Sequence, residues 1–192
     1  MIMNNTSKNI LLLCIGGLLS AIGIMIPLVA PKLVIEPASF TLASHVAVFI
    51  AMFISPGMAV SVAFISSIGF LLAGFPLVVV LRALSHLVFA LLGAYLIKKN
   101  NYMLLSPKTI VPFALGISIV HAVCEVTVTS LYYFGTGKST TTYYILGLVG
   151  LGTIVHSMID FSIATAVWIP LQHVLTIPAN AKVRKAPRLN VQ

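Results

Sequence analysis

Apolar residues follow one another along this chain in long runs, and polar residues gather in the short segments between the runs. The runs do not alternate between apolar and polar positions, as the strands of a membrane barrel do over about 10 residues. Several runs reach about 20 residues, the length that a helix needs to cross the hydrocarbon core of a bilayer. The pattern predicts six helices, at residues 9–29, 41–54, 57–73, 77–97, 108–133 and 143–172.

Proline and glycine mark the breaks between these runs. They predict one tight turn at residues 55–57 and another at 74–76. The segment 31–40, which follows the first run, is too short and too polar to cross a bilayer. We therefore expect an all-α membrane protein with one six-helix domain over residues 1–178 and a basic tail over residues 179–192.

The composition supports a membrane environment. Hydrophobic residues make up 59% of the chain and charged residues only 7%, whereas a soluble domain carries about 25% charged residues. So few charges cannot cover a surface exposed to water. In lipid each backbone polar group must be paired inside the protein, which a helix achieves by itself. The composition thus excludes an ordinary water-soluble domain.

The basic residues are distributed unevenly between the two sides of the predicted membrane domain. With six crossings both termini lie on one side. That side carries Lys8, Lys98, Lys99, Lys108, Lys182, Arg184, Lys185 and Arg188, and the other carries Lys32 and Lys138. Because basic loops stay in the cytoplasm, we expect both termini there. This topology accounts for the net charge of +8, so we expect no nucleic-acid partner, and the tail can also contact membrane lipid.

A small set of ionisable side chains remains inside the predicted helices. They are His45, Arg82, His86, His121, Glu125, His156 and Asp160. Such groups are costly in hydrocarbon and usually face a cavity or a partner. Six of them form three pairs with i,i+4 spacing, one pair on each of the last three helices, and this spacing places both members on one helix face. We expect the three faces to converge on one interior site, although the pair His156 and Asp160 also fits a relay or a purely structural tie.

Arg82 is the strongest candidate for binding a ligand. Its guanidinium stays charged and forks onto carboxylates, so it can pair with Glu125 at rest and with an anionic ligand afterwards. His45, His86 and His121 can donate hydrogen bonds. The candidates for an aromatic wall are Phe75, Tyr132, Tyr133 and Tyr143. Histidine and carboxylate at this spacing also ligate metals. Because Arg82 repels a cation, we expect no metal, and we expect no cofactor.

The first helix carries a different pattern, a face of small residues. Gly16 pairs with Ser20 and Gly17 with Ala21 at a spacing of four. Small residues allow another helix to approach closely in lipid, either within this protein or on another membrane subunit. The sequence contains no Gly-x-x-x-x-Gly-Lys nucleotide loop and no hydrolase motif. We therefore expect neither an enzyme nor an ATPase.

Several segments together resemble the substrate-binding (S) components of energy-coupling factor vitamin importers, most closely their niacin-specific group. The segments are EPASFTLASH at 36–45, FIAMFISP at 49–56, Gly-Phe-Pro at 74–76, LRALSH at 81–86, and the stretches holding His121 with Glu125 and His156 with Asp160. The resemblance covers residues 10–170. It implies a multi-pass protein of the bacterial cell membrane that binds a vitamin near the outer surface, in a cavity of the last three helices lidded by the segments after the first and third.

The same resemblance implies partners. A separate membrane scaffold subunit docks on the small residues of the first helix, and two cytosolic ATPases drive import. The family uses an alanine pair where this chain has glycines, and its cobalt and nickel members carry a histidine at the second position, where this chain has Ile2.

Three functions are compatible with the residues. Nicotinate, the anion of niacin, is planar and needs a cation, a donor for its ring nitrogen and an apolar wall. Pantothenate is also an anion, but it is longer and carries hydroxyl groups, for which the chain offers few partners. A proton-coupled carrier of small molecules, with histidine–carboxylate pairs as relays, is the alternative from another class.

Overall fold

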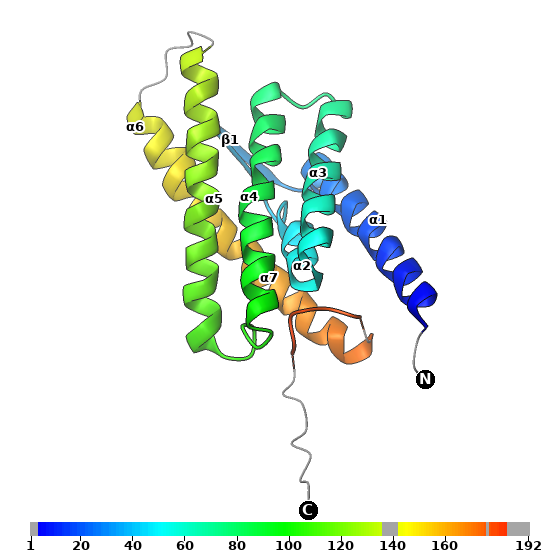
Figure 1. Ribbon diagram of the computed structural model, residues 1–192. Helices are drawn as coiled ribbons and strands as arrows, with labels where there is room; N and C mark the ends of the chain where they lie inside the picture. The colour runs from blue at the N-terminus through cyan, green and yellow to red at the C-terminus, as the bar shows by residue number, and fades with distance from the viewer. Residues whose placement is uncertain (1–3, 136–141, 176, 184–192) are drawn as a thin grey trace, which may run out of the picture.

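The computed structural model describes residues 4–135, 142–175 and 177–183. Its elements, in chain order, are α1 (Asn5–Val29), β1 (Lys32–Ile35), β2 (Ala38–Thr41), α2 (Val46–Ile54), α3 (Pro56–Leu72), α4 (Leu77–Lys99), α5 (Pro107–Gly135), α6 (Thr142–Tyr144), the π-helix η1 (Ile145–Leu151) and α7 (Gly152–Val174). The helices form one bundle, and α6, η1 and α7 run on as one long helical rod that crosses behind α4 and α5 (Figure 1).

Four helical segments of the described chain are long and apolar enough to cross a membrane. They are α1, α4, α5 and the continuous rod Thr142–Val174. Large apolar side chains such as Leu13 and Leu72 are more than three-quarters exposed on the outer surface, as expected where the solvent is lipid. The prediction of an all-α membrane protein is confirmed. The shorter α3 completes the outer layer, and the predicted basic residues from 184 onward lie outside the described residues.

The interior is organised around α2, which among the described helices is longer only than α6 and η1. All nine residues of α2 are buried, and it contacts α1, α3, α4 and α7. Phe49 and Phe53 of α2 pack edge-on against Phe161 of α7. Gly93 of α4 allows Met52 to lie directly against the helix backbone, because an added Cβ would collide with its sulfur. Because every face of α2 is packed against another helix, its residues are apolar all round and show no amphipathic pattern.

The second predicted helix begins later than the sequence indicated. Residues 42–45 form a turn, in which Ala43 adopts a positive φ of 65°, and α2 starts only at Val46. Positive φ is costly for a residue with a Cβ. Here the turn is held because Asp160 accepts the backbone N–H groups of Ala43 and His45, at 2.8 and 2.9 Å. A hydrophobic pattern cannot reveal a helix start that depends on a distant carboxylate.

The polar segment after α1 folds into an antiparallel hairpin of β1 and β2, in which Lys32 pairs with Thr41 and Ile35 with Ala38. In Figure 1 the hairpin passes behind α4. It is fixed to α7 by close packing, because a Cβ added to Gly152 would lie 2.6 Å from Cζ of Phe40. The hairpin therefore lies over one end of the bundle.

Residues 177–183 pack against the opposite end. The backbone N–H groups of Asn180 and Ala181 donate to the carbonyls of Ile54 and Phe53, at 3.0 and 2.9 Å, and Lys182 N donates to Asn101 O at 2.8 Å. The last carbonyls of a helix have no partner inside it, so this segment caps α2. The predicted tail from residue 179 thus begins as a packed segment up to Val183.

Candidate functional site

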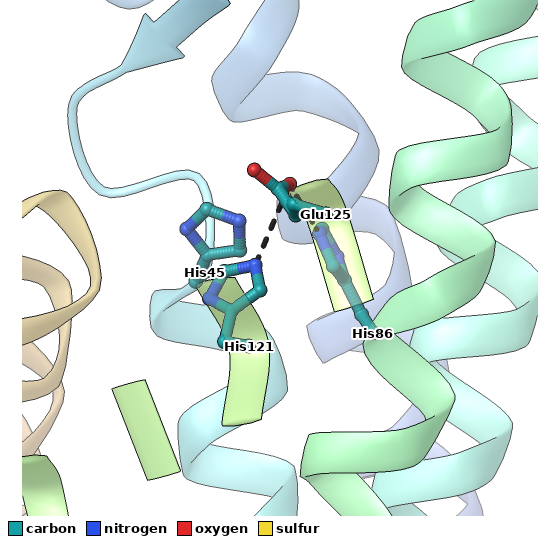
Figure 2. Close-up of side chains that lie close together, drawn as sticks. All are labelled: His45, His86, His121 and Glu125. Carbon is teal, nitrogen blue, oxygen red and sulfur yellow. Dashed lines mark hydrogen bonds and ion pairs between the residues drawn. The ribbon is translucent and has the colours of Figure 1, made fainter. Parts of the chain in front are cut away.

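Glu125 of α5 is the centre of a buried polar cluster. Its Oε2 accepts hydrogen bonds from Nη2 of Arg82 and from Oγ1 of Thr153, each at 2.7 Å. Its Oε1 faces Nε2 of His86 at 3.3 Å and Nε2 of His121 at 3.5 Å (Figure 2). The side chains of Arg82 and Glu125 are only 7% and 4% exposed. A carboxylate so deeply buried needs several donors to offset the loss of hydration, and three helices supply them here.

A second carboxylate, Asp160 of α7, lies beside this cluster. Besides the backbone of Ala43 and His45, it contacts His45 Nδ1 at 2.9 Å and Nε2 of His156 at 3.3 Å. Asp160 therefore does two things at once, because it fixes the turn before α2 and orients the His45 ring. The i,i+4 pair of His156 and Asp160 is real, but most of the partners of Asp160 come from another part of the chain.

Four imidazole rings meet between the two carboxylates. The centroid of His45 lies 4.7 Å from that of His86, 4.6 Å from that of His121 and 5.0 Å from that of His156. His86 and His121 are themselves 4.8 Å apart. The three polar helix faces therefore converge, as their spacing indicated, and His45 stands at the point where they meet.

A cavity of about 290 Å³ opens above the cluster. Its polar side consists of Arg82, His86, Glu125, His45 and His156. Phe40, Phe70, Phe75 and Tyr133 lie on its apolar side, and Lys32 and Glu36 of the hairpin line it as well. The volume is close to the lower end of the range for small-molecule sites, about 300–1,000 Å³. The cavity can hold a small polar molecule in contact with a buried cation.

The walls of the cavity include more helices than the sequence indicated. The last three long helices contribute, but Gly23 and Pro27 of α1 and Ala63 and Ser66 of α3 line it too. These helices reach the cavity because α2 is short. Only Val48, in the first turn of α2, contributes to the lining from this helix. The space left beyond α2 is bounded by α1 and α3 and covered by the hairpin.

Two predicted ligand-binding residues lie differently from the rest. His121 is fully buried and is not among the described residues that line the cavity. It lies behind His45 and His86. Tyr132 is likewise not among the described lining residues, whereas its neighbour Tyr133 is. Adjacent positions on a helix differ by about 100°, so of these two predicted tyrosines only Tyr133 joins the phenylalanines of the aromatic wall.

Three hydroxyl groups of the site were not predicted. Thr153 donates to Glu125, Ser157 Oγ lies 3.2 Å from His121 Nδ1, and Ser44 Oγ lies 3.2 Å from His156 Nε2. Thr153, Ser157 and Asp160 share one face of α7, because Ser157 follows Thr153 by four residues and Asp160 follows Ser157 by three. The same helical spacing that linked the charged residues in the sequence also links these hydroxyl residues to Asp160.

The small-residue face of α1 is divided between two surroundings. Ser20 is buried, and a Cβ added to Gly16 would lie 3.0 Å from the sulfur of Met58 in α3. Gly17 and Ala21 are exposed, and a Cβ on Gly17 would meet no atom within 4 Å. One half of the predicted docking face therefore packs inside this protein, and the other half is available on its surface.

Comparison with known proteins gives a clear relative. Over 156 residues the chain is 41% identical to "Niacin transporter NiaX" of Lactococcus lactis subsp. cremoris (strain MG1363), and the match covers 79% of this chain and 70% of that protein. No protein-family model and no solved structure matches the chain. The relative is a transporter and not an enzyme, and the long apolar helices place the chain across the bacterial cell membrane several times. The chain therefore belongs to the family of NiaX, as its resemblance to the niacin-type S components predicted.

Proposed function

We propose that this protein is the membrane-embedded binding subunit for niacin and delivers it for ATP-driven import by an energy-coupling factor complex. The observation that carries the proposal is Arg82, a buried cation at the wall of a small cavity, in a chain related to a niacin transporter. A buried guanidinium that already holds a carboxylate is suited to hold another one from a ligand.

The contacts of Glu125 make such an exchange feasible. When the nicotinate carboxylate binds Arg82 in place of Glu125, Glu125 still has Thr153, His86 and His121 as neighbours. It is therefore not left without hydrogen-bond donors. His86, His45 and His156 face the cavity and can bond the ring nitrogen. Phe70, Phe75 and Tyr133 provide the apolar wall for the ring.

The position of the cavity fits binding from outside. The cavity lies at the start of α4, next to Pro76 and Val78, whereas Lys98 and Lys99 close the same helix at its other end. A helix of this length rises about 35 Å, which spans the bilayer core. With the basic end in the cytoplasm, the cavity and its hairpin face the outside.

Transport itself then depends on other subunits. The sequence holds no nucleotide-binding loop, so we assign energy supply to two ATPases and coupling to a membrane scaffold. The exposed positions Gly17 and Ala21 of α1 are the proposed contact with that scaffold, because small exposed residues in lipid favour close helix packing.

The test is calorimetric binding of nicotinate to the purified protein. An ionic hydrogen bond contributes about 1.5–3 kcal/mol net, so Arg82→Gln should weaken binding by about ten- to more than a hundredfold. Lys108→Gln, which removes the same charge from the exposed start of α5, should bind like the unmodified protein. Excess pantothenate should not displace nicotinate. If Arg82→Gln binds nicotinate normally, or pantothenate displaces it, the assigned role or substrate is wrong.

A further inference from the structure

Two imidazoles of the site have their Nδ1 atoms occupied by partners outside the cluster. His45 Nδ1 lies 2.9 Å from Asp160 Oδ2, and His121 Nδ1 lies 3.2 Å from Ser157 Oγ. A carboxylate next to a ring nitrogen binds its N–H, which leaves the lone pair on the other nitrogen. The Asp160 carboxylate therefore directs the His45 ring to present Nε2 as an electron-pair donor, and the Ser157 hydroxyl, which can accept from Nδ1 of His121, is compatible with the same tautomer there. Carboxylates behind histidine ligands have this role in metal sites.

The remaining donor atoms of the cluster face one another. One nitrogen from each of His45, His86 and His121 and one oxygen of Glu125 lie within 4.8 Å of one another, and all four residues are buried. Figure 2 shows the three rings gathered around the Glu125 carboxylate. His121 Nε2 is fully buried and makes no hydrogen bond with any described residue, although Glu125 Oε1 lies 3.5 Å away. Buried polar atoms are normally satisfied, and a cation held between the rings would satisfy this nitrogen.

The charge of the cluster also favours a cation. Arg82 was expected to repel a metal, but its guanidinium is bound to Oε2 of Glu125, and Oε1 is the oxygen that faces the imidazoles. With neutral imidazoles, the one positive charge of Arg82 stands against the two negative charges of Glu125 and Asp160. The buried group then has a net charge of −1, which is unfavourable for an anion that enters the cavity alone.

We propose that His45, His86, His121 and Glu125 bind one divalent transition-metal ion of the zinc class at the floor of the cavity. Three imidazoles and one carboxylate form a ligand set that zinc and its neighbours accept in tetrahedral geometry. Asp160 and Ser157 orient two of the ligands from behind. The ion changes the net charge of the group from −1 to +1, so an anionic ligand in the same cavity binds more tightly in its presence. This site goes beyond the proposed function and does not require nicotinate to be the substrate.

The metal site is tested with the full chain, purified in detergent through a tag without histidine and stripped with a chelator. Titration with Co²⁺ should produce the visible absorption bands of a tetrahedral cobalt site, saturating at about one ion per chain, and Zn²⁺ should remove them. Asp160→Asn, which changes the carboxylate that contacts His45 Nδ1, should weaken binding by about 10- to 100-fold, and the ligand variant His121→Gln should weaken it further. His173→Gln, at the exposed end of α7, is the matched control and should bind like the unmodified protein.

Several outcomes overturn the site. One is a stripped unmodified protein that shows no saturable Co²⁺ or Zn²⁺ binding, a result that does not depend on any variant folding. Another is equal metal binding by His121→Gln and His173→Gln, which indicates an adventitious ion only. A third is nicotinate affinity that is independent of metal and rises as pH falls, which assigns the missing positive charge to a protonated imidazole. Metal binding without nicotinate binding supports the site and refutes only the proposed function.

Discussion

At the scale of single residues, Glu125 and Arg82 depend on each other. Glu125 is bound from three helices, yet only Arg82 among its described partners is permanently charged. A buried ion pair adds little compared with an apolar pair of the same volume, but removal of one partner leaves a charge in a region of low dielectric constant. The stability of the site therefore depends on keeping the two charges together.

This dependence gives a prediction for unfolding. Glu125→Gln leaves the Arg82 guanidinium buried without a carboxylate at 2.7 Å, and it should reduce the free energy of unfolding by about 3–5 kcal/mol. The double variant Arg82→Gln with Glu125→Gln removes both charges at nearly constant volume and should recover most of the loss. Thermal unfolding in detergent measures both. A double variant no more stable than Glu125→Gln contradicts the idea that the unpaired charge is the cause.

At the scale of elements, the hairpin of β1 and β2 determines how closed the cavity is. It contributes Lys32, Glu36 and Phe40 to the lining, and Phe40 lies 5.3 Å from the His156 ring, centroid to centroid. On the other side Phe40 contacts the backbone of Gly152, at the point where the π-helix η1 passes into α7. π-Helical turns are frequent at functional sites, and this one brings a glycine under the hairpin.

Gly152→Ala should therefore displace the hairpin. Its Cβ would lie 2.6 Å from Phe40 Cζ, so the Phe40 ring must shift, and we expect β2, which carries this ring, to shift with it. We expect faster dissociation of nicotinate from Gly152→Ala, measured by stopped-flow displacement. Gly147→Ala in the same rod has no atom within 4 Å of the new Cβ and should dissociate at the normal rate. Adding Phe40→Leu to Gly152→Ala should restore slow release, and failure of this rescue contradicts the proposed contact.

At the scale of the whole molecule, the surface proposed for ligand binding and the surface proposed for scaffold docking are different. The cavity is enclosed by the hairpin and the inner helix faces, whereas Gly17 and Ala21 face outward on α1. The first surface is the proposed site of ligand recognition, and the second is the proposed contact with the scaffold subunit. Because the two surfaces share no residue, a substitution can affect one and spare the other.

Gly17→Leu should separate the two activities. A Cβ added at Gly17 meets no atom within 4 Å, and the position is exposed, so we expect folding and nicotinate binding to be unchanged. The larger side chain prevents close packing of a partner helix. Uptake of labelled nicotinate by cells that produce the scaffold and ATPases should fall at least tenfold, together with copurification of the scaffold. Gly116→Leu, also with open space around it on α5, is the matched control. Normal uptake by Gly17→Leu refutes docking at this face.

The sequence by itself determined the features that depend on local pattern. The length of an apolar run and the residues that interrupt it define a spanning helix, so α4 and α5 were predicted within about two residues of their ends. Spacing of four along a helix defines a shared face, so the pairs of Arg82 with His86 and His121 with Glu125 were identified before any contact was known.

Only the tertiary structure decided how those faces meet. The rotation of each helix about its axis and its depth in the bundle depend on packing, which is why Tyr133 and not Tyr132 lines the cavity and why His121 lies behind it. The short α2 begins after a turn held by Asp160, a residue 115 positions away from His45. No local pattern encodes such a distance, so the central place of His45 among the four imidazoles emerges only from the folded bundle.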